Sequence, residues 1–147
     1  MAIKASTGLR NKLLDTSPFK TVFNLSFLNV YAGAVPADAD ASVGGATLLC
    51  AYSNNNTATG LTFAAAAASG AITKNLGETW SHAAVGTGTA TFYRLVAAGD
   101  TGGSSTTEAR VQGTVGLAGA DLNLASLSFS ASTVYTVDTY TLSLPTN

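Results

Sequence analysis

Few residues in this chain have types and spacings that could support catalysis. His82 is the sole histidine and Cys50 the sole cysteine. A nucleophile and base pair therefore has one candidate base, and neither local sequence has the form of a hydrolase nucleophile signature. A single histidine also excludes a cluster of several histidine metal ligands. We interpret Cys50 as a small buried apolar side chain and His82 as a structural or solvated residue.

The acidic stretch Asp38-Ala-Asp-Ala-Ser42 has the opening spacing of an EF-hand calcium loop. Such a loop needs glycine at its sixth position and a bidentate glutamate at its twelfth, where this chain has Val43 and Leu49. We therefore expect an acidic surface loop without a metal. The sequence has no dinucleotide-binding glycine repeat, Walker sequence or Gly-x-Ser-x-Gly elbow. We predict no cofactor and no enzymatic activity.

Arg94 is the one charged residue within the most apolar segment, Gly88 to Gly99. An unpaired charge is costly in such surroundings. We therefore predict a structural ion pair between Arg94 and a carboxylate, with Asp121, Asp138 and Glu78 as the candidate partners.

The composition describes a folded chain with an unusually uncharged surface. Of the 147 residues, 46% are hydrophobic and only 10% are charged, against about 25% charged in ordinary domains. Thr, Ser, Asn, Gly and Ala replace the missing charge, which suits packing against other protein subunits. The net charge of -1 argues against nucleic acid as a partner. The longest run of low polarity, 61–72, is too short to span a membrane.

The first twenty residues carry most of the positive charge. They contain four basic residues and one acidic residue, whereas the remainder has three basic and seven acidic residues. Thr7 can cap a helix over 7–15, and its leucines fall on one stripe at helical spacing. Such a short helix needs a surface to pack on, in this chain or in another subunit. The predicted contact residues are Ile3, Lys4, Leu9, Arg10, Lys12, Leu13 and Leu14. The alternative is a solvated segment with no partner.

Short alternating segments separated by Gly, Asn and Pro turns fill the rest of the chain. Both faces of the segment 88–99 are apolar, which predicts a central strand. Further strands are expected at 19–31 with a bend near Phe27, at 47–53, around 64–72, from Trp80, at 110–115, and at 134–144 before Pro145. Roughly eight such strands are typical of a β-sandwich or jelly roll. We predict an all-β fold with an arm and short helix at 1–18 and a β-sandwich body at 19–147.

Several segments resemble a family of small virion proteins of tailed bacteriophages. They are residues 2–15 (AIKASTGLRNKLLD), 28–40 (LNVYAGAVPADAD), Leu48-Leu49, Glu78-x-Trp80-Ser81, Gly88-Thr-Ala-x-Phe92-x-Arg94, Gln112-Gly-Thr-Val-Gly116 and Asp121-Leu122. Proteins of this kind are similar to capsid decoration, or cement, proteins. The resemblance implies a protein on the capsid surface of the virion that is made in the host cytoplasm. It also implies binding to the major capsid protein and association with other copies of itself in a dimer or trimer. Nucleic acid and membrane are not expected partners.

The sequence is also compatible with two other functions. One is a phage tail or head-completion protein, because such proteins use similar sandwiches. The other is a carbohydrate-binding module with an aromatic platform. The candidate platform residues are Trp80, Tyr52, Tyr93 and Tyr135, and for each of them the alternative is packing in the core.

Overall fold

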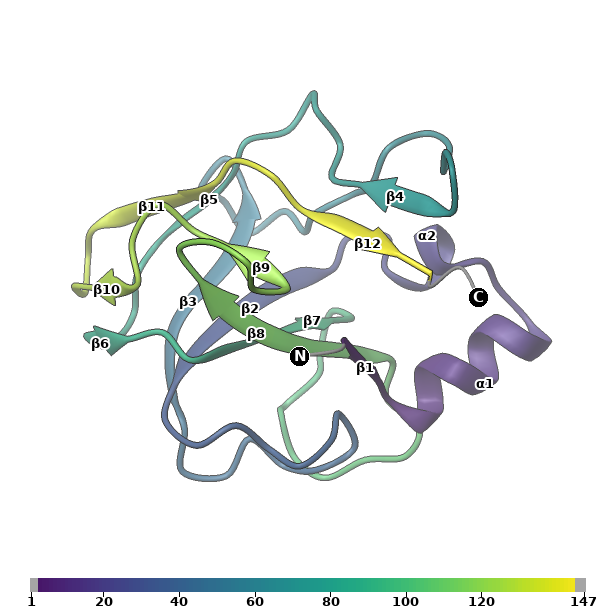
Figure 1. The fold of residues 1–147 in the computed structure, drawn as a ribbon, viewed down its shortest axis with the longest axis horizontal. Helices are drawn as coiled ribbons and strands as arrows, with labels where there is room; N and C mark the ends of the chain where they lie inside the picture. The colour runs from purple at the N-terminus through teal and green to yellow at the C-terminus, as the bar shows by residue number, and fades with distance from the viewer. Residues whose placement is uncertain (1–2, 145–147) are drawn as a thin grey trace.

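Strand β7 (Phe92–Val96) lies in the middle of the main sheet, paired with β2 (Phe27–Ala32) on one side and β8 (Arg110–Gly116) on the other. All five of its residues are buried. The computed structural model describes residues 3–144, and within them the predicted central strand is confirmed. The prediction of an all-β domain is also confirmed (Figure 1).

The main sheet has eight strands in the order β1-β8-β7-β2-β3-β5-β11, with β9 beside β8. Its remaining strands are β1 (Lys4–Ala5), β3 (Thr47–Asn54), β5 (Trp80–Ala83), β9 (Leu122–Asn123) and β11 (Val134–Val137). All pairings are antiparallel except that of β8 with β9. Two small ribbons pair β4 (Ala71–Thr73) with β12 (Thr141–Ser143) and β6 (Gly88–Thr89) with β10 (Ser128–Phe129).

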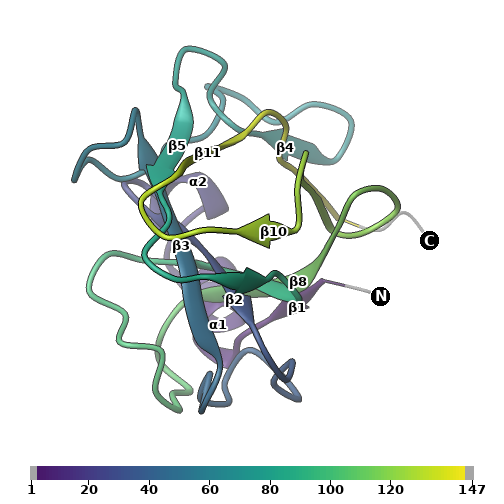
Figure 2. The ribbon, with the colours of Figure 1, turned by 90° about the vertical axis from the view of Figure 1, so that its left-hand side faces the viewer.

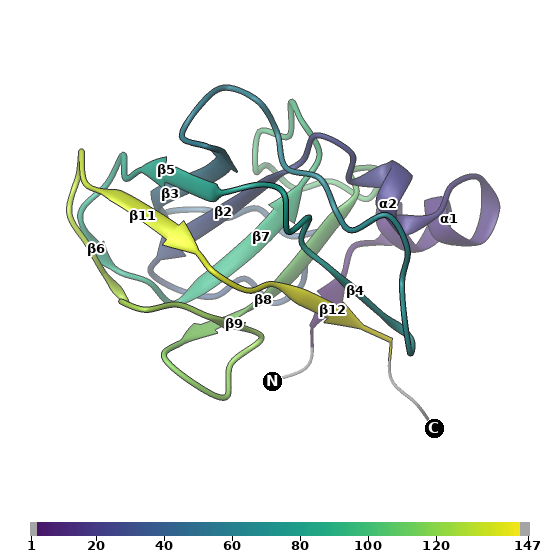
Figure 3. The ribbon, with the colours of Figure 1, turned by 90° about the horizontal axis from the view of Figure 1, so that it is seen from above.

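After β11, the last strand of the main sheet, the chain continues to β12 and forms a second layer over the sheet (Figures 1 and 3). Tyr140 points from this layer into the core, and its ring meets Tyr93 of β7 edge-on at 5.8 Å. Trp80 and Phe63 pack beside it. The ribbon β6–β10 lies at the end of the molecule away from the helices (Figures 1 and 2).

The expected strand over 19–31 is wrong in its first part. Residues Phe19–Val22 form the short helix α2, which follows Pro18 at its N-cap. Because Phe19 and Phe23 are four residues apart, helical spacing brings their rings to 4.7 Å. Leu25 then has a φ of 59°, and this left-handed residue ends the helical turn before β2 begins. The irregularity in β2 lies between Val30 and Tyr31, not near Phe27.

Two expected long strands are divided. After β6, the backbone amide of Ala90 donates to Leu127 and that of Thr91 donates to Tyr31. The chain therefore leaves the small ribbon and joins the main sheet within two residues. The closing strand is divided in the same way at 138–140, since β11 pairs with β5 and β12 with β4. The expected end of that strand at Pro145 lies outside the described residues.

Helix α1 (Thr7–Asp15) is confirmed over the predicted residues, although its N-cap is Ser6 and not Thr7. The Ser6 hydroxyl accepts from the amide of Leu9 at 3.1 Å and donates to the carbonyl of Glu108 at 2.7 Å. One side chain thus caps the helix and ties it to the chain just before β8. Thr7 instead donates hydrogen bonds to the carboxylate of Asp40.

Candidate functional site

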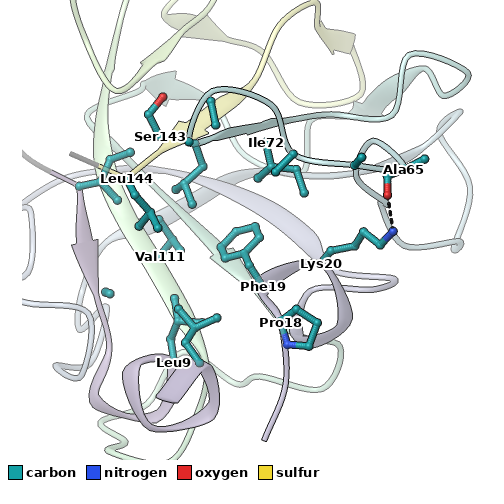
Figure 4. Close-up of a pocket in the computed structure, with 17 residues that line it drawn as sticks. Leu9, Pro18, Phe19, Lys20, Ala65, Ile72, Val111, Ser143 and Leu144 are labelled. Atoms are coloured by element: carbon teal, nitrogen blue, oxygen red, sulfur yellow. Dashed lines mark hydrogen bonds between the residues drawn. The ribbon is translucent and has the colours of Figure 1, made fainter. Parts of the chain in front are cut away.

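An apolar groove of about 670 Å³ lies between helix α1 and the β4–β12 ribbon (Figure 4). Leu9 and Leu13 of α1 form one side, and Ala71 and Leu142 of the ribbon form the other. Further side chains along the groove are Ile3, Phe19, Ile72, Val111 and Leu144. Its volume is in the range of small-molecule binding sites.

Lys20 is the one charged residue among those that line the groove within 3–144. Its ammonium group donates to the carbonyl of Ala65 at 2.6 Å, as the dashed line in Figure 4 marks. No carboxylate or imidazole is among these lining residues, and Ser143 supplies a hydroxyl. The arrangement can bury apolar groups and hold a negative group near Lys20. It offers no acid and base pair for catalysis.

The structure divides the predicted contact residues between the groove and its surroundings. Ile3, Leu9 and Leu13 line the groove. Leu9 is only 2% exposed and also belongs to the core, whereas Leu14 is 88% exposed on the outer side of α1. Arg10 and Lys12 are exposed on the same helix. Lys4 points elsewhere, since its ammonium group donates to the carbonyl of Ala37 at 2.6 Å.

The N-terminal segment is clamped to the body of the protein. Lys4 and Ala5 pair with β8. The amide and hydroxyl of Thr7 donate to the two carboxylate oxygens of Asp40, at 2.8 and 2.6 Å. The Thr7 hydroxyl and amide lower the pKa of this carboxyl, which lies at the positive end of the helix dipole. The positive segment therefore meets an acidic loop of its own chain.

Gly8 allows helix α1 to lie directly against the backbone of the segment before β8. A Cβ at this position would collide with the backbone of Thr107 and Glu108. We predict that Gly8→Ala lowers the free energy of unfolding by about 1–3 kcal/mol, because overpacking against backbone outweighs the gain in helix propensity. Urea denaturation of the full chain measures the change. Gly45→Ala is the matched control because a Cβ there meets no atom within 4 Å. Equal effects of the two substitutions on stability would contradict the close packing of Gly8 against this backbone.

The predicted ion pair of Arg94 is wrong. Arg94 is fully buried, and its guanidinium donates to Gln112 at 2.9 Å and to the carbonyls of Asp38 and Ala41 at 3.1 and 2.8 Å. Neutral oxygens of the 33–46 loop and β8 thus replace a carboxylate. Burial lowers the pKa of this guanidinium. Asp121, one of the expected partners, instead accepts from Thr114.

Within the described residues the ion pair is formed by Arg110 and Asp100, with Nε and Oδ2 2.6 Å apart. Both side chains are at most 1% exposed, and the second guanidinium nitrogen donates to the other carboxylate oxygen at 2.7 Å. Arg110 begins a strand and Asp100 lies in a Gly- and Ser-rich loop, so nothing in their local sequence indicated burial. The pair fixes the 98–107 loop to β8.

Cys50 is confirmed as a buried apolar side chain. Burial raises the pKa of its thiol to about 12, so the thiol is neutral near pH 7. Its sulfur lies 3.5 Å from the backbone oxygen of His82, and the His82 imidazole contacts the carbonyl of Ala83. The two residues are neighbours across β3 and β5, but the thiol and imidazole do not form the pair that a cysteine hydrolase requires.

The acidic loop forms turns and contacts with the helix. Asp38 accepts from the amides of Asp40 and Ala41, at 3.0 and 2.8 Å. Within 3–144 no group of three or more His, Cys, Asp and Glu side chains is placed to hold a metal ion.

Three of the four aromatic residues considered as a sugar platform lie in the core. Trp80, Tyr52 and Tyr93 are at most 1% exposed. Tyr135 is half-buried, with its ring 4.3 Å from that of Phe129. Core packing, the alternative for these aromatic residues, is therefore confirmed for Trp80, Tyr52 and Tyr93.

Comparison of the chain with models of known protein families, with curated protein sequences and with solved structures finds no match. In the part of the chain that the structure describes, no helix has the length and apolar character needed to cross a membrane.

Proposed function

We propose that this protein is a virion structural protein, a decoration protein that binds the outer surface of a tailed-phage capsid and bridges major capsid subunits. The sequence resemblance of residues 2–15 and 28–40 to small phage virion proteins supports the choice of the capsid as the surface. The geometry around α1 supports binding by shape and adhesion.

The observation that carries the proposal is an exposed apolar and basic surface around α1. We call it the docking face and define it as the outer side of α1, beside the groove. Leu14 is 88% exposed, Leu13 41% and Leu144 69%. Arg10 and Lys12 lie on the same helix. Leucines exposed together beside a groove are typical of an interaction surface.

The docking face is held rigidly, which favours binding. Ser6, Thr7 and Leu9 fix α1 to β8, to the acidic loop and to the core. A surface ordered before binding loses less conformational entropy when the complex forms. A rigid docking face can make the same contacts at each of the many equivalent sites on a shell.

We predict that Leu14→Asp weakens binding to phage heads by about tenfold or more. A leucine that becomes buried at an interface contributes about 1.5–3 kcal/mol, and an aspartate would carry an unpaired charge into the contact. The change should leave folding almost unaffected because the side chain is exposed. The measurement is co-sedimentation of the full chain with heads purified without this protein.

Val85→Asp is the matched control. Val85 is 59% exposed and lies in the connection from β5 to β6, and β6 is at the end of the molecule away from α1 (Figure 1). It should bind as the wild type does, at a fixed ratio to the major capsid protein. Equal binding by the wild type and Leu14→Asp would contradict the docking face. Wild-type binding to tails and not to heads would support the tail alternative instead.

A further inference from the structure

We propose that the apolar groove receives a second copy of this chain, through the turn that joins β4 to β5. We call this turn the knob and define it as residues Asn75–Glu78 with the neighbouring Asp138. The inference rests on the proposed function, because copies bound to equivalent sites on a shell can meet through the same pair of surfaces.

The knob presents one large apolar side chain from a fixed backbone. Leu76 is 85% exposed. The amides of Gly77 and Glu78 donate to the side chain and the carbonyl of Asn75, at 2.9 and 3.1 Å. Asn75 and Glu78 are also both hydrogen-bonded to Thr62. The turn is therefore ordered before any partner arrives, which lowers the entropy cost of inserting Leu76.

The charges of the knob and the groove are complementary. Asp138 is exposed and borders the same shallow hollow as Leu76. Lys20 is the charged residue that lines the described part of the groove. The first twenty residues have an excess of basic groups and the remainder an excess of acidic groups. A second copy thus brings an apolar group with a carboxylate to an apolar groove with an ammonium group.

The two surfaces lie at opposite ends of the β4–β12 ribbon. Ala71 and Ser143, which are paired at one end, line the groove, whereas Thr73 and Thr141, which are paired at the other end, border the hollow beside the knob. One copy therefore cannot fill its own groove with its own knob. The contact joins unlike surfaces of two copies, and such contacts build closed rings or open chains.

The test uses two variants of the full chain, Leu13→Asp in the groove and Leu76→Asp in the knob. Light scattering after size-exclusion chromatography should find assemblies for the wild type and monomers for each variant. An equimolar mixture of the variants should form a one-to-one dimer, because one intact groove and one intact knob remain. Val85→Asp and Leu117→Asp, at exposed positions outside both surfaces, should assemble as the wild type does.

The charge contribution is tested separately. Asp138→Lys should weaken association roughly two- to fivefold, as expected for an exposed ion pair, and Lys20→Glu in the same chain should restore it. A wild type that remains monomeric at every concentration would overturn the inference, as would assembly unaffected by Leu13→Asp and Leu76→Asp, or variants that do not complement each other. A monomeric wild type that still sediments with heads would leave the decoration role standing. An assembling wild type that ignores heads would contradict that role alone.

Discussion

Asp100→Asn is expected to lower the free energy of unfolding by about 3–5 kcal/mol near pH 7, because it leaves the buried Arg110 charge without its partner. Both side chains are at most 1% exposed and share two hydrogen bonds, of 2.6 and 2.7 Å. Equilibrium denaturation in urea at pH 7 measures the change. Asp138→Asn is the matched control, because Asp138 is exposed and should alter stability by no more than about 0.5 kcal/mol.

The effect of Asp100→Asn should depend on pH in a defined direction. Burial alone would raise the pKa of Asp100, but the hydrogen bonds and charge of Arg110 and the amide of Gly102 lower it overall. A carboxyl with a lowered folded-state pKa stabilises the protein above its unfolded pKa of about 3.9, and this contribution is lost as the pH falls through the folded-state value. The wild type and Asp100→Asn should therefore differ fully above about pH 5 and converge below about pH 4. A difference in the free energy of unfolding that stays constant as the pH falls from about 7 to well below about 4 would contradict the pairing of Asp100 with Arg110.

Trp80→Ala is expected to cost about 3–5 kcal/mol of stability, as removal of a large buried aromatic side chain does. Trp80 is fully buried, with its ring 5.5 Å from Phe63 and 5.7 Å from Tyr140, and its indole nitrogen donates to Glu78 at 3.0 Å. Thermal unfolding should shift by on the order of 10 °C. The loss removes the anchor that joins β5 to the second layer.

Trp80→Phe is the matched change, because it keeps an aromatic ring in the cluster and should cost less than Trp80→Ala. If Trp80→Ala left stability unchanged and removed retention on a glycan column, the core position of this residue would be contradicted. That result would support the alternative that Trp80 binds carbohydrate.

Local patterns were enough to predict the centre of the sheet. The apolar residues on both faces of 92–96 indicated β7 because a strand covered on both sides has no polar face. The leucine stripe of α1 predicted that helix over its full length. In each case residues close in sequence determine the structure.

The sequence-based predictions were wrong where the structure depends on contacts between residues that are far apart in the sequence. Phe19 and Phe23 fit either strand or helical spacing, and the packing of Phe19 against Phe63 at 5.3 Å favours the helix. Arg94 needed acceptors, but a sequence does not reveal that backbone carbonyls 53 and 56 residues away can supply them. The groove was missed in part for the same reason. Leu9 and Leu13 were predicted contact residues, but their partners across the groove come from the β4–β12 ribbon.

The central proposal is that this protein acts by adhesion on a repeating shell, and cryo-electron microscopy of phage particles from a lysate in which this protein is made tests this proposal most directly. The account predicts density for this fold on the outer surface of the head, at every symmetry-equivalent site, with the outer side of α1 against the shell. Particles whose heads lack this density, with the protein recovered only from the tail or from the soluble fraction of the lysate, would contradict the account.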